Sequence, residues 1–86
     1  MAKLIPAADR LILARELILK AREYPVPEEG GRYDFSYVAH VKDLVRQAKD
    51  MVKYLPQSAG ASKTIKDDAV RILREAEQAE EEILHG

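Results

Sequence analysis

Hydrophobic side chains recur along this chain at alternating intervals of three and four residues. In the first such series a large residue alternates with alanine: Leu4, Ala7, Leu11, Ala14, Ile18 and Ala21. These intervals match the a and d positions of a heptad, so they predict an amphipathic helix over about residues 6–24. Alanine at every second position of the seam predicts that a neighbouring helix approaches closely.

Two later stretches repeat the same intervals. The second series is Tyr37, Val41, Leu44, Ala48, Met51 and Leu55, flanked by Val38, Val45 and Val52. The third series is Ile65, Ala69, Ile72, Ala76, Ala79 and Ile83. They predict helices over about residues 35–55 and 63–84, with Asp34 as the N-cap of the former and Ser62 or Thr64 as the N-cap of the latter.

Prolines and glycines separate the three predicted helices. Pro25 and Pro27 end the first helix and Gly30-Gly31 follows them, while Pro56 ends the second. Because both connections are short, neighbouring helices should run antiparallel. We therefore predict one all-α domain over residues 1–86, an antiparallel up-down-up three-helix bundle held together by heptad seams of leucine, isoleucine and alanine.

The first helix has more apolar surface than its seam explains. At about 100° per residue, Leu13, Leu17 and Tyr24 form a second apolar row, and Ile12 and Leu19 form a third. Leaving the four aliphatic side chains in water would forgo about 6–10 kcal/mol at ~1.5–3 kcal/mol each, which rivals the stability of a whole domain. These five residues are therefore predicted to form a protein interface, with a second copy as a homodimer or with another protein. The alternative is a central first helix covered by linker residues such as Val26 and Phe35.

A row of basic side chains follows one side of the second helix. Its members are Lys42, Arg46, Lys49 and Lys53, with Arg32, Tyr33 and Phe35 near its start. Basic groups can bind phosphates and an exposed aromatic ring can stack on a base, so the row and Arg32 are candidates for weak nucleic-acid or anion binding. Asp43 and Asp50 lie beside the row as ion-pair partners, and the formal net charge of −1 disfavours nucleic-acid binding.

Residues suited to catalysis or metal binding are sparse. The chain has no cysteine, and its two histidines are isolated from each other. Glu82 and His85 have the Glu-x-x-His spacing of di-iron bundles, but such a site needs a second pair, and His40 has no glutamate three residues before it. The glutamates of the third helix share it with lysines and arginines, which is typical of a solvated surface. We predict no cofactor, no metal ion and no catalytic residue.

The composition indicates which broad class of protein the chain belongs to. Hydrophobic residues make up 47% of the chain and charged residues 34%, as in a folded domain. Charges interrupt every apolar run well before the ~18 residues of a membrane span. Without a secretory leader pattern or cysteine, we expect a cytoplasmic protein. The sequence favours a small, non-enzymatic interaction module that self-associates or binds a protein through its first helix; the alternative is a weak nucleic-acid or anion binder.

Overall fold

The computed structural model describes residues 6–85, and within that range it contains helices but no strand. The α-helices are α1 (Ala7–Glu23), α2 (Phe35–Val52) and α3 (Lys63–His85). Two short 3-10 helices, η1 (Gly31–Tyr33) and η2 (Leu55–Gln57), lie in the connections. The prediction of an all-α chain is confirmed. Leu4, the first residue of the predicted seam, lies outside the described residues.

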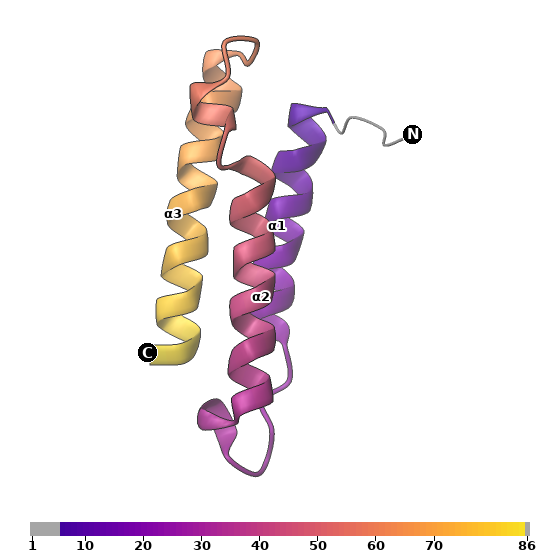
Figure 1. The fold of residues 1–86 in the computed structure, drawn as a ribbon, viewed down its shortest axis with the longest axis vertical. Helices are drawn as coiled ribbons and strands as arrows, with labels where there is room; N and C mark the ends of the chain where they lie inside the picture. The colour runs from indigo at the N-terminus through magenta and orange to yellow at the C-terminus, as the bar shows by residue number, and fades with distance from the viewer. Residues whose placement is uncertain (1–5, 86) are drawn as a thin grey trace.

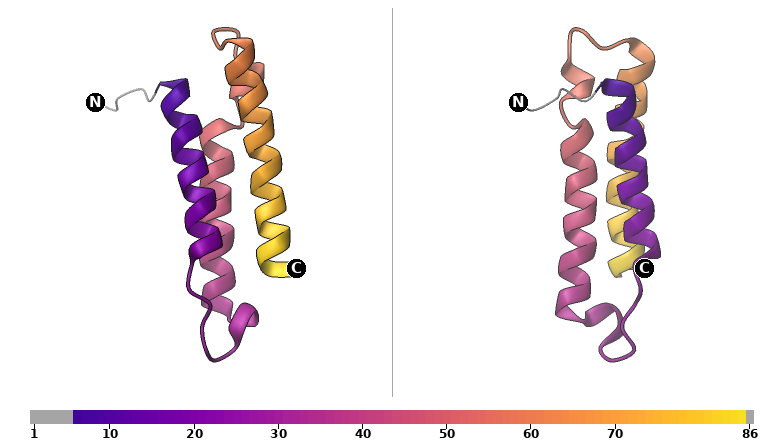
Figure 2. Two further views of the ribbon diagram at one scale, coloured as in Figure 1. Left: turned by 180° about the vertical axis from the view of Figure 1, so that it is seen from behind. Right: turned by 90° about the vertical axis from the view of Figure 1, so that its right-hand side faces the viewer.

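The three α-helices lie side by side along the long axis of the molecule (Figure 1). The chain runs down α1, returns along α2 and runs down again along α3, and its two connections lie at opposite ends. α1 packs more extensively on α2 than on α3, and α3 contacts both other helices. Seen from the side, α1 lies in front of α3 and beside α2 (Figure 2, right), and neither of these two helices covers the side of α1 that faces the viewer.

Local sequence explains where the helices begin and end. α1 ends at Glu23, and Tyr24 after it has an extended backbone (ψ 129°), the conformation that a following proline favours. Asp34 caps α2 by accepting a hydrogen bond from the Tyr37 amide at 2.9 Å. Ser62 Oγ accepts one from the Ile65 amide at 3.2 Å, at the start of α3. The connection into α2 turns at Gly30, whose φ of 80° favours glycine.

The core is centred on small side chains. Every buried residue in the described range is hydrophobic, and the largest that are fully enclosed are Ile72, Val41, Val45 and Val52. Six alanines complete the centre: Ala14, Ala21, Ala48, Ala69, Ala76 and Ala79. Larger side chains, among them Leu17, Leu44, Met51 and Leu73, pack around the edge and stay partly exposed. Alanines therefore occupy the positions where the helices meet, and leucines surround them.

The buried side of α2 differs from the predicted seam. Leu44 and Met51 were expected at its centre, with Val45 and Val52 flanking it; instead the two valines are buried and Leu44 and Met51 are only partly buried. The side chains of α2 that are enclosed are those that lie between its contacts with α1 and α3, and the seven-residue repeat alone does not determine that position. The buried residues of α2 are centred about 40° further around the helix than the predicted series, on the side of Val45 and Val52.

Candidate interaction surfaces

Two aliphatic side chains stand out on the outer side of α1. Ile12 is 54% exposed and Leu19 is 55% exposed, although both residues belong to a well-formed helix. They are seven residues apart and so lie within about 20° of each other around the helix. Both are turned away from the buried seam that contains Leu11 and Ile18. They form a short apolar row that the rest of the described chain leaves uncovered.

Charged residues of opposite sign border this apolar row. Arg15 and Arg22 follow it on one side, and Glu16 and Glu23 follow it on the other; all four are exposed. The members of each pair are seven residues apart, the same spacing as that of Ile12 and Leu19, so each pair runs alongside the apolar row. These six residues are called the outer face of α1 below. Its pattern is an apolar centre between a basic side and an acidic side.

The other predicted interface residues on α1 are partly used by the fold itself. Leu13 is partly buried, and Leu17 and Tyr24 pack against the core. The Tyr24 ring lies 5.9 Å from that of Tyr37 and stacks on His40 with centroids 5.3 Å apart. The structure thus separates the five residues into an exposed pair, Ile12 and Leu19, and three that are partly buried. Whether any of the five meets a partner stays a prediction.

Because only Ile12 and Leu19 are exposed, the monomer forgoes less hydrophobic burial energy than four exposed aliphatic residues would. Full burial of a leucine or isoleucine side chain contributes about 1.5–3 kcal/mol. At 54% and 55% exposure, Ile12 and Leu19 together forgo about 1.5–3 kcal/mol. That is several times less than the sequence suggested, because Leu13 and Leu17 are already partly covered. A folded monomer can therefore leave the outer face uncovered and still be stable.

The basic row of α2 pairs with acids of its own helix. Arg46 donates a hydrogen bond to Asp43, which also accepts one from Gln47 at 2.7 Å. Lys53 lies 3.2 Å from Asp50, with its ammonium 5.0 Å from the centre of the Tyr54 ring. The bond from Arg46 lowers the pKa of Asp43, and the carboxylates raise the pKa of Arg46 and of Lys53. Lys42 is exposed and Lys49 is partly buried. Much of the row's charge is therefore compensated locally.

Two aromatic rings protrude at the start of α2. Tyr33, in η1, is 88% exposed and Phe35, the first residue of α2, is 89% exposed. Arg32 is exposed beside them. At about 100° per residue, Phe35 lies on the same side of α2 as the basic row. This aromatic pair and the row together make the second surface whose residues suit a ligand.

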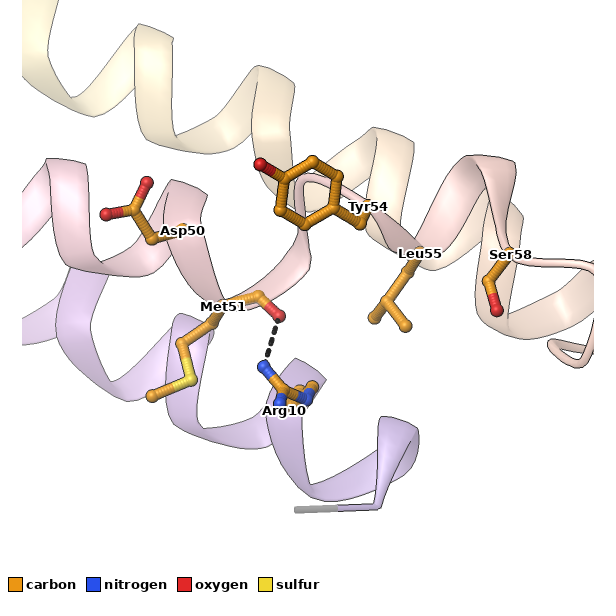
Figure 3. Close-up of a pocket in the computed structure, with 6 residues that line it drawn as sticks. All are labelled: Arg10, Asp50, Met51, Tyr54, Leu55 and Ser58. Carbon is orange, nitrogen blue, oxygen red and sulfur yellow. Dashed lines mark hydrogen bonds between the residues drawn. The ribbon is translucent and has the colours of Figure 1, made fainter. Parts of the chain in front are cut away.

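A small depression lies where α1 begins and α2 ends. It has a volume of about 220 Å³, and the residues around it are Arg10, Asp50, Met51, Tyr54, Leu55 and Ser58 (Figure 3). Arg10 donates a hydrogen bond of 3.4 Å to the Met51 carbonyl across it. Ligand pockets usually measure about 300–1,000 Å³, so this depression is small for a substrate. The sequence did not predict it, because its residues come from three segments that only the fold brings together.

The described residues offer little for catalysis or metal binding. No group of three potential ligand side chains comes together within residues 6–85. Glu82, half of the Glu-x-x-His spacing, instead forms an ion pair of 2.8 Å with Arg22 of α1. In the same range, no buried polar side-chain atom lacks a hydrogen-bond partner. None of the described helices combines the length and the apolar character needed to cross a membrane.

The two candidate surfaces differ in their chemistry. The outer face of α1 is apolar at its centre, whereas the basic row of α2 is charged along its length. Comparison of the chain with protein families, with curated proteins and with solved structures finds no match.

Proposed function

We propose that this chain is a small, non-enzymatic interaction module, a single up-down-up three-helix domain built on heptad seams that binds a protein through the outer face of α1. The observation that carries the proposal is the exposure of Ile12 and Leu19 at 54% and 55% on one side of a helix. An apolar centre with a polar border is the arrangement that protein interfaces have.

The proposal requires that the outer face be dispensable for the fold of the monomer. In the variant I12E/L19E, two carboxylates replace the exposed aliphatic side chains. Because these positions face solvent, we expect the dilute variant to stay helical and to melt within a few degrees of the parent, corresponding to less than about 1 kcal/mol. The measurement is circular dichroism with thermal melting at ~10 µM, where a weak complex is dissociated.

A matched control comes from α3. The variant V70E/Q78E introduces the same change of charge at two exposed positions of another helix. It should melt like I12E/L19E. If I12E/L19E unfolds while V70E/Q78E does not, Ile12 and Leu19 belong to the core of the domain, and the proposal fails.

A second candidate function rests on Tyr33 and Phe35, which are the most exposed large hydrophobic side chains in the described chain, at 88% and 89%. With Arg32 and the basic row of α2, they would suit a single-stranded nucleic acid, whose bases stack on rings and whose phosphates bind arginine. This candidate is the weaker of the two, because Arg46 and Lys53 already pair with Asp43 and Asp50.

A further inference from the structure

We propose that the partner of the outer face of α1 is a second copy of this chain, bound so that the two α1 helices lie side by side and parallel. The inference rests on the proposed function, because it assigns a partner to the same face. Its basis is the order of charges across that face: basic on one side of the apolar row and acidic on the other.

Helical geometry fixes where these charges stand. At about 100° per residue, Arg15 and Arg22 lie roughly 60° to one side of the row formed by Ile12 and Leu19. Glu16 and Glu23 lie roughly 40° to its other side. Along the helix axis, Arg15 and Glu16 fall between the two aliphatic residues. The outer face thus alternates an apolar level, a charged level, an apolar level and a second charged level.

A two-fold axis parallel to α1 makes this face complementary to itself. Such an axis brings the basic side of one copy against the acidic side of the other. Arg15 then faces Glu16 of the second copy, and the contact occurs twice. The aliphatic residues meet their own counterparts, Ile12 with Ile12 and Leu19 with Leu19. Each aliphatic residue of the face therefore meets an aliphatic residue of the second copy, and Arg15 and Glu16 each meet an opposite charge.

The antiparallel arrangement is disfavoured by the same charges. Its two-fold axis is perpendicular to the helices and passes between them, so it places the basic side of one copy against the basic side of the other. Arg15 then meets Arg15, and Glu16 meets Glu16. Like charges placed together oppose association and select against that orientation. Arg22 already pairs with Glu82 of its own chain, at 2.8 Å, so we assign the discriminating contact to Arg15 and Glu16.

Charge reversal distinguishes the two orientations. In a parallel pair, R15E or E16R alone places like charges together, whereas R15E/E16R restores two opposite pairs. We expect each single variant to weaken dimerisation by about tenfold and the double variant to recover most of it, as measured by sedimentation equilibrium up to ~500 µM. The control R74E reverses one exposed charge on α3 and should leave the dissociation constant unchanged.

Cysteine cross-linking tests the same geometry without charge changes, because the chain has no native cysteine. In a parallel pair, I12C and L19C should each form a disulfide with its own counterpart. A mixture of I12C with ¹⁵N-labelled L19C should give few mixed disulfides, since the two levels are about 10 Å apart and a disulfide spans at most ~6.8 Å between Cα atoms. A39C, on an exposed position of α2, measures random collision.

Each outcome has one meaning. Self-cross-linking of I12C and of L19C above the A39C level, with rescue by R15E/E16R, is the expected result. Preferential mixed disulfides, or single charge reversals without effect on a dimer, overturn the parallel arrangement. A parent that is monomeric at ~500 µM, with cross-linking no faster than that of A39C, overturns the second copy as partner. That last result leaves the proposed function standing if I12E/L19E still folds, which separates the two failures.

Discussion

The outer face of α1 and the basic row of α2 both follow the solvent side of a helix, but they treat charge differently. On α2, Asp43 pairs with Arg46 and Asp50 pairs with Lys53, each three residues apart on the same helix. On α1, Arg15 and Glu16 stand on opposite sides of an apolar row, where the row itself separates them. Arg22 reaches another helix, α3, to form its ion pair with Glu82.

This difference is why we propose a partner for the outer face of α1 rather than for the basic row of α2. Charges that pair within one helix need no other molecule, and their compensation leaves a weaker field for an anion. On α1 an exposed apolar row lies between Arg15 and Glu16, and a surface that covered the row would bring opposite charges to both of them. The apolar row, rather than the number of charges, is therefore the feature on which the proposed interaction surface rests.

The largest loss of stability is expected from substitutions on the inner, buried side of α1, whereas the outer face is exposed. Ala14 is fully buried, so Ala14→Leu should overpack the seam and destabilise the fold by about 1–3 kcal/mol. Ala76→Leu on α3 should do the same, because Ala76 is also fully buried. Ala39 of α2 is exposed, and Ala39→Leu is the control, with an expected change within about 0.5 kcal/mol. Thermal melting measures all three; parent-like melting of both buried variants would contradict the assigned seam.

A smaller effect is expected from reversing the basic row of α2. In K42E/R46E/K49E we expect the fold and any self-association to be unchanged, because these residues lie away from the outer face of α1. At physiological salt, neither the parent nor the variant should bind a single-stranded oligonucleotide measurably in a fluorescence-anisotropy titration. Sub-micromolar binding by the parent would reverse the ranking of the two surfaces. Its logarithmic salt dependence, with a slope of about −0.7 per phosphate neutralised, would then give the number of contacts.

The smallest effect concerns the titration of Asp43. Its hydrogen bond with Arg46 lowers the pKa of the carboxyl below its usual 3.8, so the stabilisation is complete above that value. It is lost as the pH falls through the lower, folded-state pKa. Because the pair is exposed, the change in stability should be slight. Carboxyl NMR should show the Asp43 midpoint moving up towards 3.8 in R46Q; an identical midpoint in the parent and R46Q would mean that the pair does not persist in solution.

Local features of the fold were predictable because single residues determine them. Asp34 and Ser62 have short polar side chains directly before apolar series, and both cap the following helix. Leu11, Ala14, Ile18 and Ala21, predicted as the seam of the first helix, are the buried residues of α1. Each of these inferences needs only the chemistry of one helix and its period.

Features that depend on two neighbours at once were not predictable in the same way. Whether Val45 or Leu44 is buried depends on how α3 shares α2 with α1, and no periodicity within α2 contains that information. The same holds for α1: Leu17 packs against the core while Leu19 does not, although both belong to apolar rows of the sequence. The sequence therefore identified the five apolar residues of α1, but the packing of the three helices determines that Ile12 and Leu19 are the exposed ones.

The alanine-rich centre of the bundle has a consequence for side-chain entropy. Six of the thirteen buried residues within positions 6–85 are alanine, which has no rotamers to lose on folding. Burying a leucine or isoleucine side chain instead costs about 0.5–1 kcal/mol of conformational entropy. Side-chain motion in the folded molecule should therefore be concentrated in the partly exposed leucines around the core, whereas the six alanines at its centre have no side-chain rotamers to exchange.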